Sequence, residues 1–424
     1  MLPMDFIREN PLLVKEAVRN KHFDVDIDLL LQLDIERRAL LTQVDTLRSE
    51  RNRIAKEIPT LSAADRPTRI SRSKEVNALL VEYEAQFADL EARYREMLLC
   101  VPNVPLPEIP IGASDSDNVE VRRWGSIPQF EFPPKDHFEL AESLGIVDFK
   151  NSHAYAGARS YSLLGDGVML QQAVLQFALQ FVAAKGFLPV SPPVLVREHA
   201  MVGTGFFPLG REETYSLPND DLFLVGTSEV CLISMHYDQM LDASRLPIRY
   251  AGLSPCFRRE AGAAGRDTRG LYRVHMFHKV EQVSIGPNDR GWSDTEHELL
   301  LANSEGILQA LGLPYRVALA CTGELGMGQV RKHEVETWVP SRNAFAETHS
   351  CSTLLEFQAR RSNIRYRQGT DAPKFVHTLN NTAIASPRIL VCLLENFQNK
   401  DGSVTIPTAL RPHLGGKEVL EPRR

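Results

Sequence analysis

The chain has 424 residues, of which 43% are hydrophobic and 24% charged, and its formal net charge is −6 at pH 7. This composition is ordinary for a globular protein with a large core and two or three domains, and the negative charge excludes a protein that coats nucleic acid without specificity. The six cysteines stand singly, the first residues lack the features of a signal peptide, and no apolar run reaches about eighteen residues. We therefore expect a soluble cytoplasmic protein with no zinc site and no membrane segment.

Two heptad patterns occupy residues 1–100. In both, apolar or long side chains recur at alternating spacings of three and four, which is typical of a long helix with one apolar seam. The first seam consists of Leu30, Leu33, Arg37, Leu40, Val44, Leu47, Arg51, Ile54 and Ile58, and the second of Val76, Leu80, Tyr83, Phe87, Leu90, Tyr94 and Met97. Pro59 and Pro67 interrupt the pattern between them, so the two helices are predicted to form an antiparallel hairpin.

The outer half of this predicted hairpin is rich in basic residues, namely Arg48, Arg51, Arg53, Lys56, Arg66, Arg69, Arg72 and Lys74. A rigid rod with a basic tip in an acidic protein is suited to contact a phosphate backbone. Two alternatives stay open, because the same periodicity is typical of a dimerisation coiled coil and because a basic tip can simply be solvated. Each helix, however, already has an antiparallel partner in the same chain, which counts against dimerisation through this arm.

Residues 101–125 are rich in proline and small polar residues and are predicted to link the N-terminal arm (1–100) to a second domain (126–424). In that domain we expect an amphipathic helix over residues 167–185, a strand over 186–196, and a mixture of strands and helices to the end. The strands do not alternate regularly with helices. The predicted fold class is therefore α+β on a mainly antiparallel sheet rather than a doubly wound parallel one.

The segment from Arg249 to Glu281 alternates basic, acidic and aromatic residues around a glycine-rich turn, and we predict an antiparallel hairpin in which Arg258 and Glu260 share one face. A second predicted face carries Arg273, His275, Phe277, Lys279 and Glu281, and the loop contains Gly262, Gly265, Arg266, Arg269 and Gly270. Guanidinium groups bind phosphates, an aromatic ring stacks on a purine, and glycines allow close approach to a ligand. The hypothesis is a nucleotide site, and the alternative is a salt-bridged surface hairpin.

Three segments in chain order carry a resemblance to a known family. GFLPVSPPVL (186–195) follows a long predicted helix, FRRE (257–260) opens the hairpin, and LNNTAIASPRILVCLLEN (379–396) runs from a strand into an apolar helix. They resemble the three signature motifs of class II aminoacyl-tRNA synthetases. Together with the helical arm, GTSE (226–229) and ETHSCS (347–352), they resemble the seryl-tRNA synthetase family over essentially the whole chain.

The resemblance implies a site for ATP and Mg²⁺. The matching ATP-binding positions are Arg258, Arg259, Glu260, Arg273, Val274, Phe277, Glu347, Thr348, His349, Ser350 and Arg388. Of these, Arg258, Glu347 and Arg388 match catalytic positions, and Glu347 and Ser350 match the Mg²⁺ positions. Arg258 would bind the α-phosphate and the substrate carboxylate, while Phe277 and Arg388 would stack on the two faces of adenine.

The resemblance also implies a pocket for L-serine. The matching positions are Thr227, Ser228, Glu229, Arg258, Glu281, Asn380 and Thr382. The implied reaction is the ATP-dependent ligation of L-serine to tRNA(Ser) through a seryl-adenylate, extended to tRNA(Sec) where that tRNA is present. The arm would bind the long variable arm of the tRNA, the catalytic domain its acceptor end, and Pro192 and Pro193 would lie at a homodimer interface.

Two other readings are kept open. A paralogue could activate serine for a non-tRNA acceptor or act as a resistance duplicate, but the full arm counts against a non-tRNA acceptor. A catalytically inactive protein could use the coiled coil only for assembly. Against that reading, Arg258, Glu260, Glu281, Glu347 and Arg388 are all present together.

Overall fold

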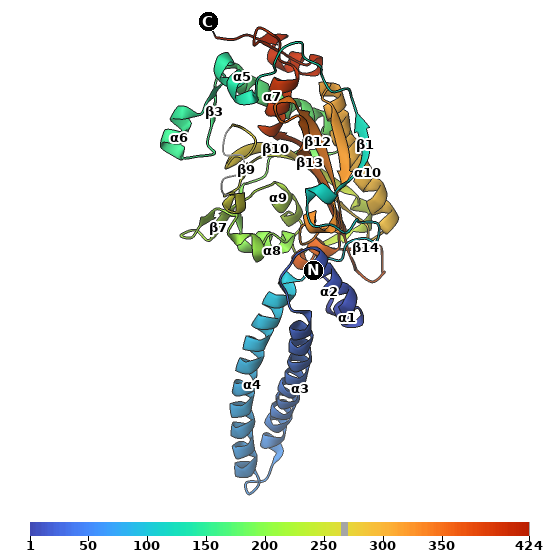
Figure 1. The fold of residues 1–424 in the computed structure, drawn as a ribbon. Helices are drawn as coiled ribbons and strands as arrows, with labels where there is room; N and C mark the ends of the chain where they lie inside the picture. Colours follow the sequence, from blue (N-terminus) through green and yellow to red (C-terminus); the bar gives the residue numbers. More distant parts are fainter. Residues whose placement is uncertain (264–269, 424) are drawn as a thin grey trace. The chain divides into compact units, whose positions relative to one another are not determined.

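The computed structural model describes residues 1–263 and 270–423, and these form two units, Leu2–Pro102 and Asn103–Arg424 with Met1 (Figure 1). Three members of the predicted glycine-rich loop, Gly265, Arg266 and Arg269, lie outside the described residues. Within the described ranges, no helix combines the length and the apolarity needed to cross a membrane.

The first unit is dominated by two long helices, α3 (Ile27–Glu57) and α4 (Arg66–Cys100), after the short helices α1 (Met4–Glu9) and α2 (Pro11–Asn20). Asp26 caps α3, since its side chain accepts from the backbone N–H groups of Asp28 and Leu29. Pro67 lies in the first turn of α4, where a missing N–H costs nothing.

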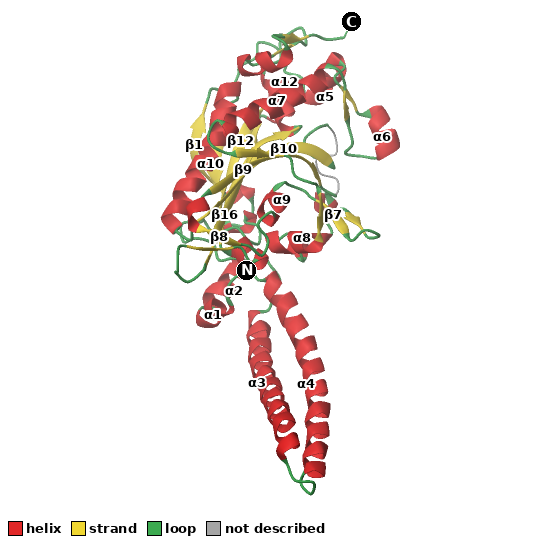
Figure 2. Cartoon of the chain, turned by 180° about the vertical axis from the view of Figure 1, so that it is seen from behind, coloured by secondary structure: helices red, strands yellow, loops and turns green. Residues whose placement is uncertain are grey.

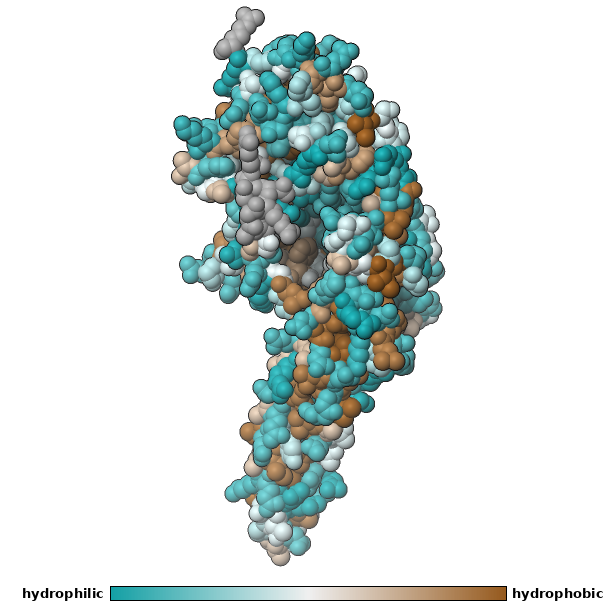
Figure 3. All heavy atoms as spheres, viewed as in Figure 1, coloured by the Kyte–Doolittle hydropathy of each residue, from teal (hydrophilic) through white to brown (hydrophobic). Residues whose placement is uncertain are grey.

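Both predicted seams are confirmed as the contact between α3 and α4. Val44 and Ile54 of the first seam and Val76 of the second are completely buried. Each helix buries only one stripe of its surface against the other. Hydrophobic and hydrophilic residues therefore both remain on the outer surface of the arm, as Figure 3 shows.

The second unit is built on an eight-stranded sheet with the order β1-β11-β12-β13-β16-β10-β9-β4 (Figure 2). The strands are β1 (Val119–Trp124), β4 (Leu188–Val190), β9 (Ile248–Phe257), β10 (Met276–Gly286), β11 (Tyr315–Leu319), β12 (Arg331–Val339), β13 (Ala344–Leu355) and β16 (His377–Ser386). Every neighbouring pair is antiparallel except β4 and β9. The predicted α+β class on a mainly antiparallel sheet is therefore confirmed.

Helices α7 (Asp166–Ala183) and α10 (Arg290–Leu311) pack on this sheet, and α12 (Arg388–Asn396) follows β16 directly. The apolar faces of these helices and of the central strands form one large core, which includes the fully buried Val174, Leu300 and Ile389. Asp289 caps the start of α10 by accepting from the N–H of Trp292, and Gly312 ends it in the left-handed conformation.

The remaining helices and strands are shorter and surround the sheet. They are α5 (His137–Leu144), α6 (Lys150–Ala156), α8 (Glu198–Thr204), α9 (Glu229–Ser234), α11 (Phe357–Ser362), β2 (Val147–Asp148), β3 (Ser162–Leu163), β5 (Leu195–Arg197), β6 (Ser216–Leu217), β7 (Leu222–Leu224), β8 (Met240–Asp242), β14 (Arg365–Arg367), β15 (Lys374–Phe375), β17 (Val404–Thr405) and β18 (Val419–Leu420).

Two expectations about strands differ from the structure. The end of the predicted linker, residues 119–124, forms β1 and pairs with β11, because its alternating valines and charged residues suit an edge strand. The predicted strand over 186–196 is divided into β4 and β5 on either side of Pro192 and Pro193. Proline has no N–H to donate to a ladder, so pairing stops there.

Candidate active site

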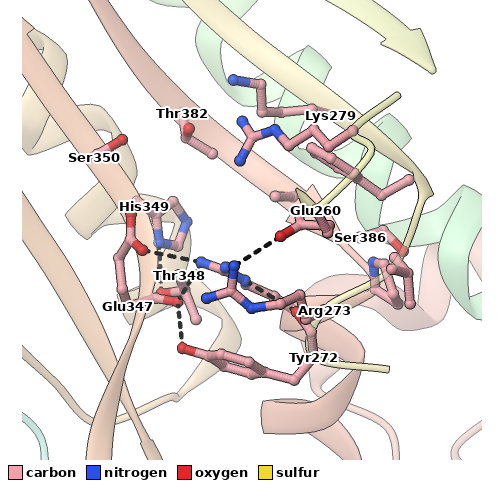
Figure 4. Close-up of a pocket in the computed structure, with 16 residues that line it drawn as sticks. Glu260, Tyr272, Arg273, Lys279, Glu347, Thr348, His349, Ser350, Thr382 and Ser386 are labelled. Carbon is pink, nitrogen blue, oxygen red and sulfur yellow. Dashed lines mark hydrogen bonds and ion pairs between the residues drawn. The ribbon is translucent and has the colours of Figure 1, made fainter. Parts of the chain in front are cut away.

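A polar pocket is lined by residues of the segment between β9 and β10 and by residues of β10, β13, β16 and α12 (Figure 4). Its walls are Arg258, Glu260, Tyr272, Arg273, Val274, Phe277, Lys279, Glu347, Thr348, His349, Ser350, Thr382, Ala385, Ser386, Pro387 and Arg388. The pocket thus brings together every predicted ATP-binding residue except Arg259. Its mixture of aromatic and charged side chains suits a nucleotide.

A bulge in β13 explains how four consecutive residues, Glu347 to Ser350, all line the pocket. Val335 of β12 pairs with His349 and Glu336 pairs with Glu347, which leaves Thr348 as the extra residue. In a regular strand only alternate side chains would face the pocket, whereas a bulge redirects its neighbours. The sequence carries no local signal for this bulge.

Arg388 connects three walls of the pocket. Its Nη1 lies 3.1 Å from Glu347 Oε2, its Nε donates to the carbonyl oxygen of Tyr272 at 3.2 Å, and its guanidinium lies 4.6 Å from the centroid of the Tyr272 ring. Burial opposes ionisation of Glu347, but the positive charges of Arg388 and Lys332 hold the pKa of this carboxyl below its usual value. Glu347 is therefore an anion at neutral pH.

The predicted strand geometry around Arg258 and Glu260 is wrong. Strand β9 ends at Phe257, and Glu260 has φ of +53°, so the two side chains do not share a strand face. Glu260 instead accepts from Arg273 Nη1 at 2.7 Å, and the guanidinium of Arg258 lies 5.1 Å from the ring centroid of Phe277. The pocket wall is built from the segments flanking the strands.

Arg273 and His275 were predicted to lie on the second strand of the hairpin, and this is also wrong, because β10 begins only at Met276. Arg259 does not line the polar pocket, and its Nη1 donates to the carbonyl oxygen of Glu212 at 3.0 Å. His349 is fully buried with its Nδ1 2.8 Å from Thr348 Oγ1, and burial lowers its pKa to about 4. His349 is therefore a neutral wall residue.

Glu229 is the centre of a buried polar cluster formed by the predicted serine-binding residues. Its carboxyl Oε1 accepts from Asn380 Nδ2 at 2.9 Å and from Gln358 Nε2 at 2.7 Å, and its N–H donates to Thr227 Oγ1 at 3.2 Å. Burial and the nearby charge of Glu281 raise the pKa of Glu229 to about 7. This carboxyl therefore titrates near neutral pH.

Glu281 lies opposite Thr382 because of a second bulge, where the register of β10 against β16 shifts between Val280 and Glu281. The hydroxyl of Thr382 donates to Glu281 Oε2 at 3.4 Å, and Lys279 Nζ forms an ion pair with the same carboxylate. Thr382 and Lys279 also line the polar pocket, so the cluster around Glu281 borders directly on it.

Ser228 has a different position from its predicted neighbours. It is completely buried, and its hydroxyl donates to the carbonyl oxygen of Gly252 at 3.3 Å. A Cβ atom at Gly252 would lie 2.5 Å from Ser228 Oγ, so only glycine permits this contact. Ser228 supports the turn that carries Thr227 and Glu229.

The predicted tRNA-binding residues of the arm are partly paired within it. Arg48 lies 2.8 Å from Glu84 and Arg72 lies 2.9 Å from Glu50, while Arg53 and Arg69 both pair with Glu57. Arg66 donates to the carbonyl oxygen of Leu61, and Arg51 to the side chain of Asn52. Lys56 and Lys74 are both exposed.

Comparison with known proteins gives two family matches and full-length relatives. Residues 1–105 match the seryl-tRNA synthetase N-terminal domain, and residues 214–397 match the tRNA synthetase class II core domain (G, H, P, S and T). A serine–tRNA ligase of Deinococcus radiodurans is 49% identical over 420 residues, covering 99% of each chain. The chain belongs to the seryl-tRNA synthetase family.

Solved structures of seryl-tRNA synthetases resemble the chain over its full length. The crystal structure of the Pyrococcus horikoshii seryl-tRNA synthetase complexed with ATP has a TM-score of 0.91 and 38% identity and covers 100% of both chains. The cytoplasmic serine–tRNA ligase of Naegleria fowleri in complex with AMP has a TM-score of 0.84 and 30% identity, covering 98% of this chain and 96% of the other.

Six residues that line the pocket or bond to Glu229 were not among the predicted site residues, and they include Ala385, Ser386 and Pro387 of the pocket wall. Lys279 and Tyr272 line the pocket, and Gln358 donates to Glu229. Phe277, Lys279 and Glu281 are two residues apart along one strand, so the sequence places Lys279 on the same face as these two predicted site residues. Gln358 lies on α11, far from Glu229 in sequence, and has no such signal.

A divalent cation is implied by the family, and Glu347 and Ser350 fit it. Both residues line the pocket and offer hard oxygen donors, which Mg²⁺ prefers. In the described part of the chain, no group of three or more His, Cys, Asp or Glu side chains is arranged to hold a metal. Mg²⁺ is typically held by one or two protein ligands together with substrate phosphates, so the smaller donor set is sufficient.

Proposed function

We propose that this member of the seryl-tRNA synthetase family ligates L-serine to tRNA(Ser) in two steps through a seryl-adenylate. The observation that carries the proposal is the position of Thr382. It lines the polar pocket and donates to Glu281, whose neighbour Glu229 is buried with Asn380 and Gln358. A substrate with an ammonium, a carboxylate and a hydroxyl suits this cluster beside a nucleotide.

In the first step, a carboxylate oxygen of serine attacks the α-phosphorus of ATP, a P–O bond forms, and pyrophosphate leaves with the electrons of the broken P–O bond. The serine carboxylate is already ionised, so no side-chain nucleophile or base is needed. Arg258 is the residue proposed to bind the α-phosphate and the serine carboxylate, and Arg273 the outer phosphates. Phe277 and Arg388 are proposed to hold adenine between them.

Glu347 and Ser350 are the residues proposed to hold Mg²⁺. When bound there, the ion would offset negative charge on the ATP phosphates. The contact between Arg388 and Glu347 fixes the orientation of this carboxylate. In the second step, the terminal adenosine hydroxyl of the tRNA attacks the carbonyl carbon of the adenylate and loses its proton. An ester C–O bond forms, the C–O bond to the phosphate breaks, and AMP leaves with its electrons.

Selection of serine follows from the polar cluster. Glu281 is proposed to bind the ammonium and Glu229 the hydroxyl. Alanine lacks the hydroxyl and would leave buried polar groups unpaired, a larger penalty than a pocket imposes for one extra methyl group. Threonine is rejected only by the space around its methyl group, about 1 to 3 kcal/mol, so threonine is the expected error substrate.

The arm residues Arg48, Arg51, Arg53, Lys56, Arg66, Arg69, Arg72 and Lys74 are proposed to bind the long variable arm of tRNA(Ser), and of tRNA(Sec) where it occurs. The acceptor end would reach the pocket. The proposed domains are the arm (1–100) and the catalytic domain (126–424). A cytoplasmic location is proposed as well, and it accords with five buried free thiols, those of Cys231, Cys256, Cys321, Cys351 and Cys392.

A homodimer is proposed through the edge of the sheet at β4. Strand β4 ends the strand order, Leu188 on it is 60% exposed and Met169 on α7 is 51% exposed. A groove next to β4 includes Pro192 and Pro193 in its walls. An exposed apolar edge strand favours association with another chain, and a second copy related by a two-fold axis would cover it.

The test is ATP/pyrophosphate exchange with serine, threonine or alanine, followed by charging of purified tRNA(Ser). We expect exchange with serine that exceeds exchange with alanine by at least about 10⁴-fold, and transfer to tRNA. Exchange with serine but no transfer to tRNA would favour the paralogue with another acceptor. Absence of exchange with any of the three amino acids would contradict the proposed function.

A further inference from the structure

A buried carboxylate outside the pocket, Glu395 on α12, receives hydrogen bonds from two distant segments. Its side chain is completely inaccessible to solvent. His137 at the start of α5 contacts Oε1 twice, through its backbone N–H at 3.0 Å and through Nδ1 at 2.8 Å. Ser341 contacts it twice as well, with its N–H donating to Oε2 and its hydroxyl to Oε1, both at 2.9 Å.

The protonation state of His137 follows from its other ring nitrogen. The backbone N–H of Leu271 donates to His137 Nε2 at 3.2 Å, so that nitrogen accepts and carries no proton. The proton is then on Nδ1, which donates to Glu395. A chain of hydrogen bonds therefore runs from Leu271 through the neutral imidazole to the buried carboxylate.

The imidazole of His137 packs closely against the backbone at Gly270. A Cβ atom at Gly270 would lie 2.1 Å from His137 Nε2, and Gly270 has φ of +82°. Only glycine at this position lets the imidazole approach the backbone closely enough to accept from Leu271. Gly270, which immediately precedes Leu271, is therefore required for this contact.

The Leu271 segment, which His137 holds, and the Ser341 segment, which Glu395 holds, meet at one aromatic ring, Tyr272. Leu271 precedes Tyr272 directly, and Ser341 precedes Arg342, whose guanidinium lies 4.0 Å from the centroid of the Tyr272 ring. Arg388 lies 4.6 Å from the same ring centroid. The hydroxyl of Tyr272 donates to the carbonyl oxygen of Glu347 at 3.4 Å. Displacement of Tyr272 would therefore move a contact of both Arg388 and Glu347.

We infer that Glu395 and His137 are positioning residues for the nucleotide site: they hold Leu271 and Ser341, and thereby fix Tyr272 against Arg388. Neither residue lines the pocket, so both act through others. The inference rests on the proposed function for its kinetic readout, because Arg388 is proposed to stack on adenine. It predicts a defect in ATP binding that leaves serine binding unchanged.

The test compares Glu395→Gln and His137→Asn with the wild type and with a matched control, Glu305→Gln. The first substitution replaces one acceptor oxygen by a donor where four donors converge. The second keeps a side-chain N–H for Glu395, but the shorter asparagine side chain cannot reach Leu271. Glu305 is likewise a buried carboxylate and accepts from Arg122 and Tyr315, but it lies on α10 away from the pocket.

Two readouts separate this inference from the proposed function. In serine-dependent ATP/pyrophosphate exchange, we expect KM for ATP to rise about tenfold in both variants, with KM for serine within about twofold and no such change in the control. In amide hydrogen exchange without ligands, the Leu271 amide should exchange about tenfold faster in both variants and not in the control. Unchanged Leu271 exchange, or an equal rise of KM for ATP in the control, would overturn the inference. A wild type without exchange activity would refute only the proposed function.

Discussion

Asn380 on β16 donates a hydrogen bond from Nδ2 to Glu229 Oε1 at 2.9 Å, although the two residues are 151 positions apart. Gln358 donates to the same oxygen. Both donors would be satisfied by the carbonyl of an amide as well as by a carboxyl, so substitution of Glu229 by glutamine preserves the hydrogen bonds and removes only the titrating charge.

The first prediction concerns Glu229→Gln and pH. The folded-state pKa of Glu229 is raised from 4.5 to about 7, so the folded protein binds this proton more tightly than the unfolded chain. The contribution of this proton to the free energy of unfolding is fully present below the unfolded-state pKa of 4.5. It is lost as pH rises through the folded-state pKa of about 7. Between about pH 4 and about pH 8, the unfolding free energy of the variant should gain on the order of 3 kcal/mol relative to the wild type. Denaturant titrations of both proteins at several pH values measure this difference, and parallel pH dependences would contradict the prediction.

The second prediction is that Arg388→Lys lowers kcat/KM for ATP on the order of 100-fold in serine-dependent exchange. Lysine keeps the charge but cannot contact Glu347, the Tyr272 carbonyl and the Tyr272 ring with one planar group. Arg316→Lys on β11 is a suitable control, because Arg316 pairs with Glu336 and Glu120 and does not line the pocket. Equal losses in the two variants would count against a specific role of Arg388.

The third prediction is that Gly252→Ala impairs the use of serine more than the use of ATP. Its Cβ would press on Ser228 Oγ at 2.5 Å and shift the turn that carries Thr227 and Glu229. Overpacking of this kind costs about 1 to 3 kcal/mol, so KM for serine should rise roughly fivefold or more. Gly210→Ala, where a Cβ meets nothing within 4 Å, should leave both KM values unchanged.

The fourth prediction concerns deletion of residues 49–72 from the arm. Arg72 lies 2.9 Å from Glu50, so the two cut ends are adjacent and a short glycine linker can join them. Loss of basic residues proposed to contact the tRNA backbone should lower kcat/KM for tRNA charging by at least about 100-fold. Serine-dependent pyrophosphate exchange should persist, and charging at the wild-type rate would exclude the arm as the tRNA-binding element.

The fifth prediction is that Leu188→Asp converts a dimer to a monomer. An aspartate on the exposed edge strand β4 would bury a charge at the proposed interface, which costs several kcal/mol. Sedimentation equilibrium measures the mass of each form, with Leu209→Asp as a control at another exposed leucine. A wild-type protein that is monomeric at micromolar concentration would contradict the proposed dimer.

Several features of the chain followed from the sequence alone. The two arm helices were predictable because their seams repeat every three and four residues, and this period depends only on helix geometry. The order of the motifs predicted which residues gather around the pocket, from Arg258 to Arg388, without fixing how they touch one another. The division of residues 186–196 by Pro192 and Pro193 was also available, since a proline cannot donate to a ladder.

The tertiary structure decided the contacts that depend on register. The bulge at Thr348 places Glu347 to Ser350 together in the pocket, and the bulge after Val280 aligns Glu281 with Thr382. Neither bulge has a local sequence signal, because it reflects how two strands distant in the chain pair. The same reason applies to the raised pKa of Glu229 and to the chain from Leu271 through His137 to Glu395. Periodicity is a property of neighbouring residues, whereas burial and hydrogen-bond partners arise only when distant segments pack together.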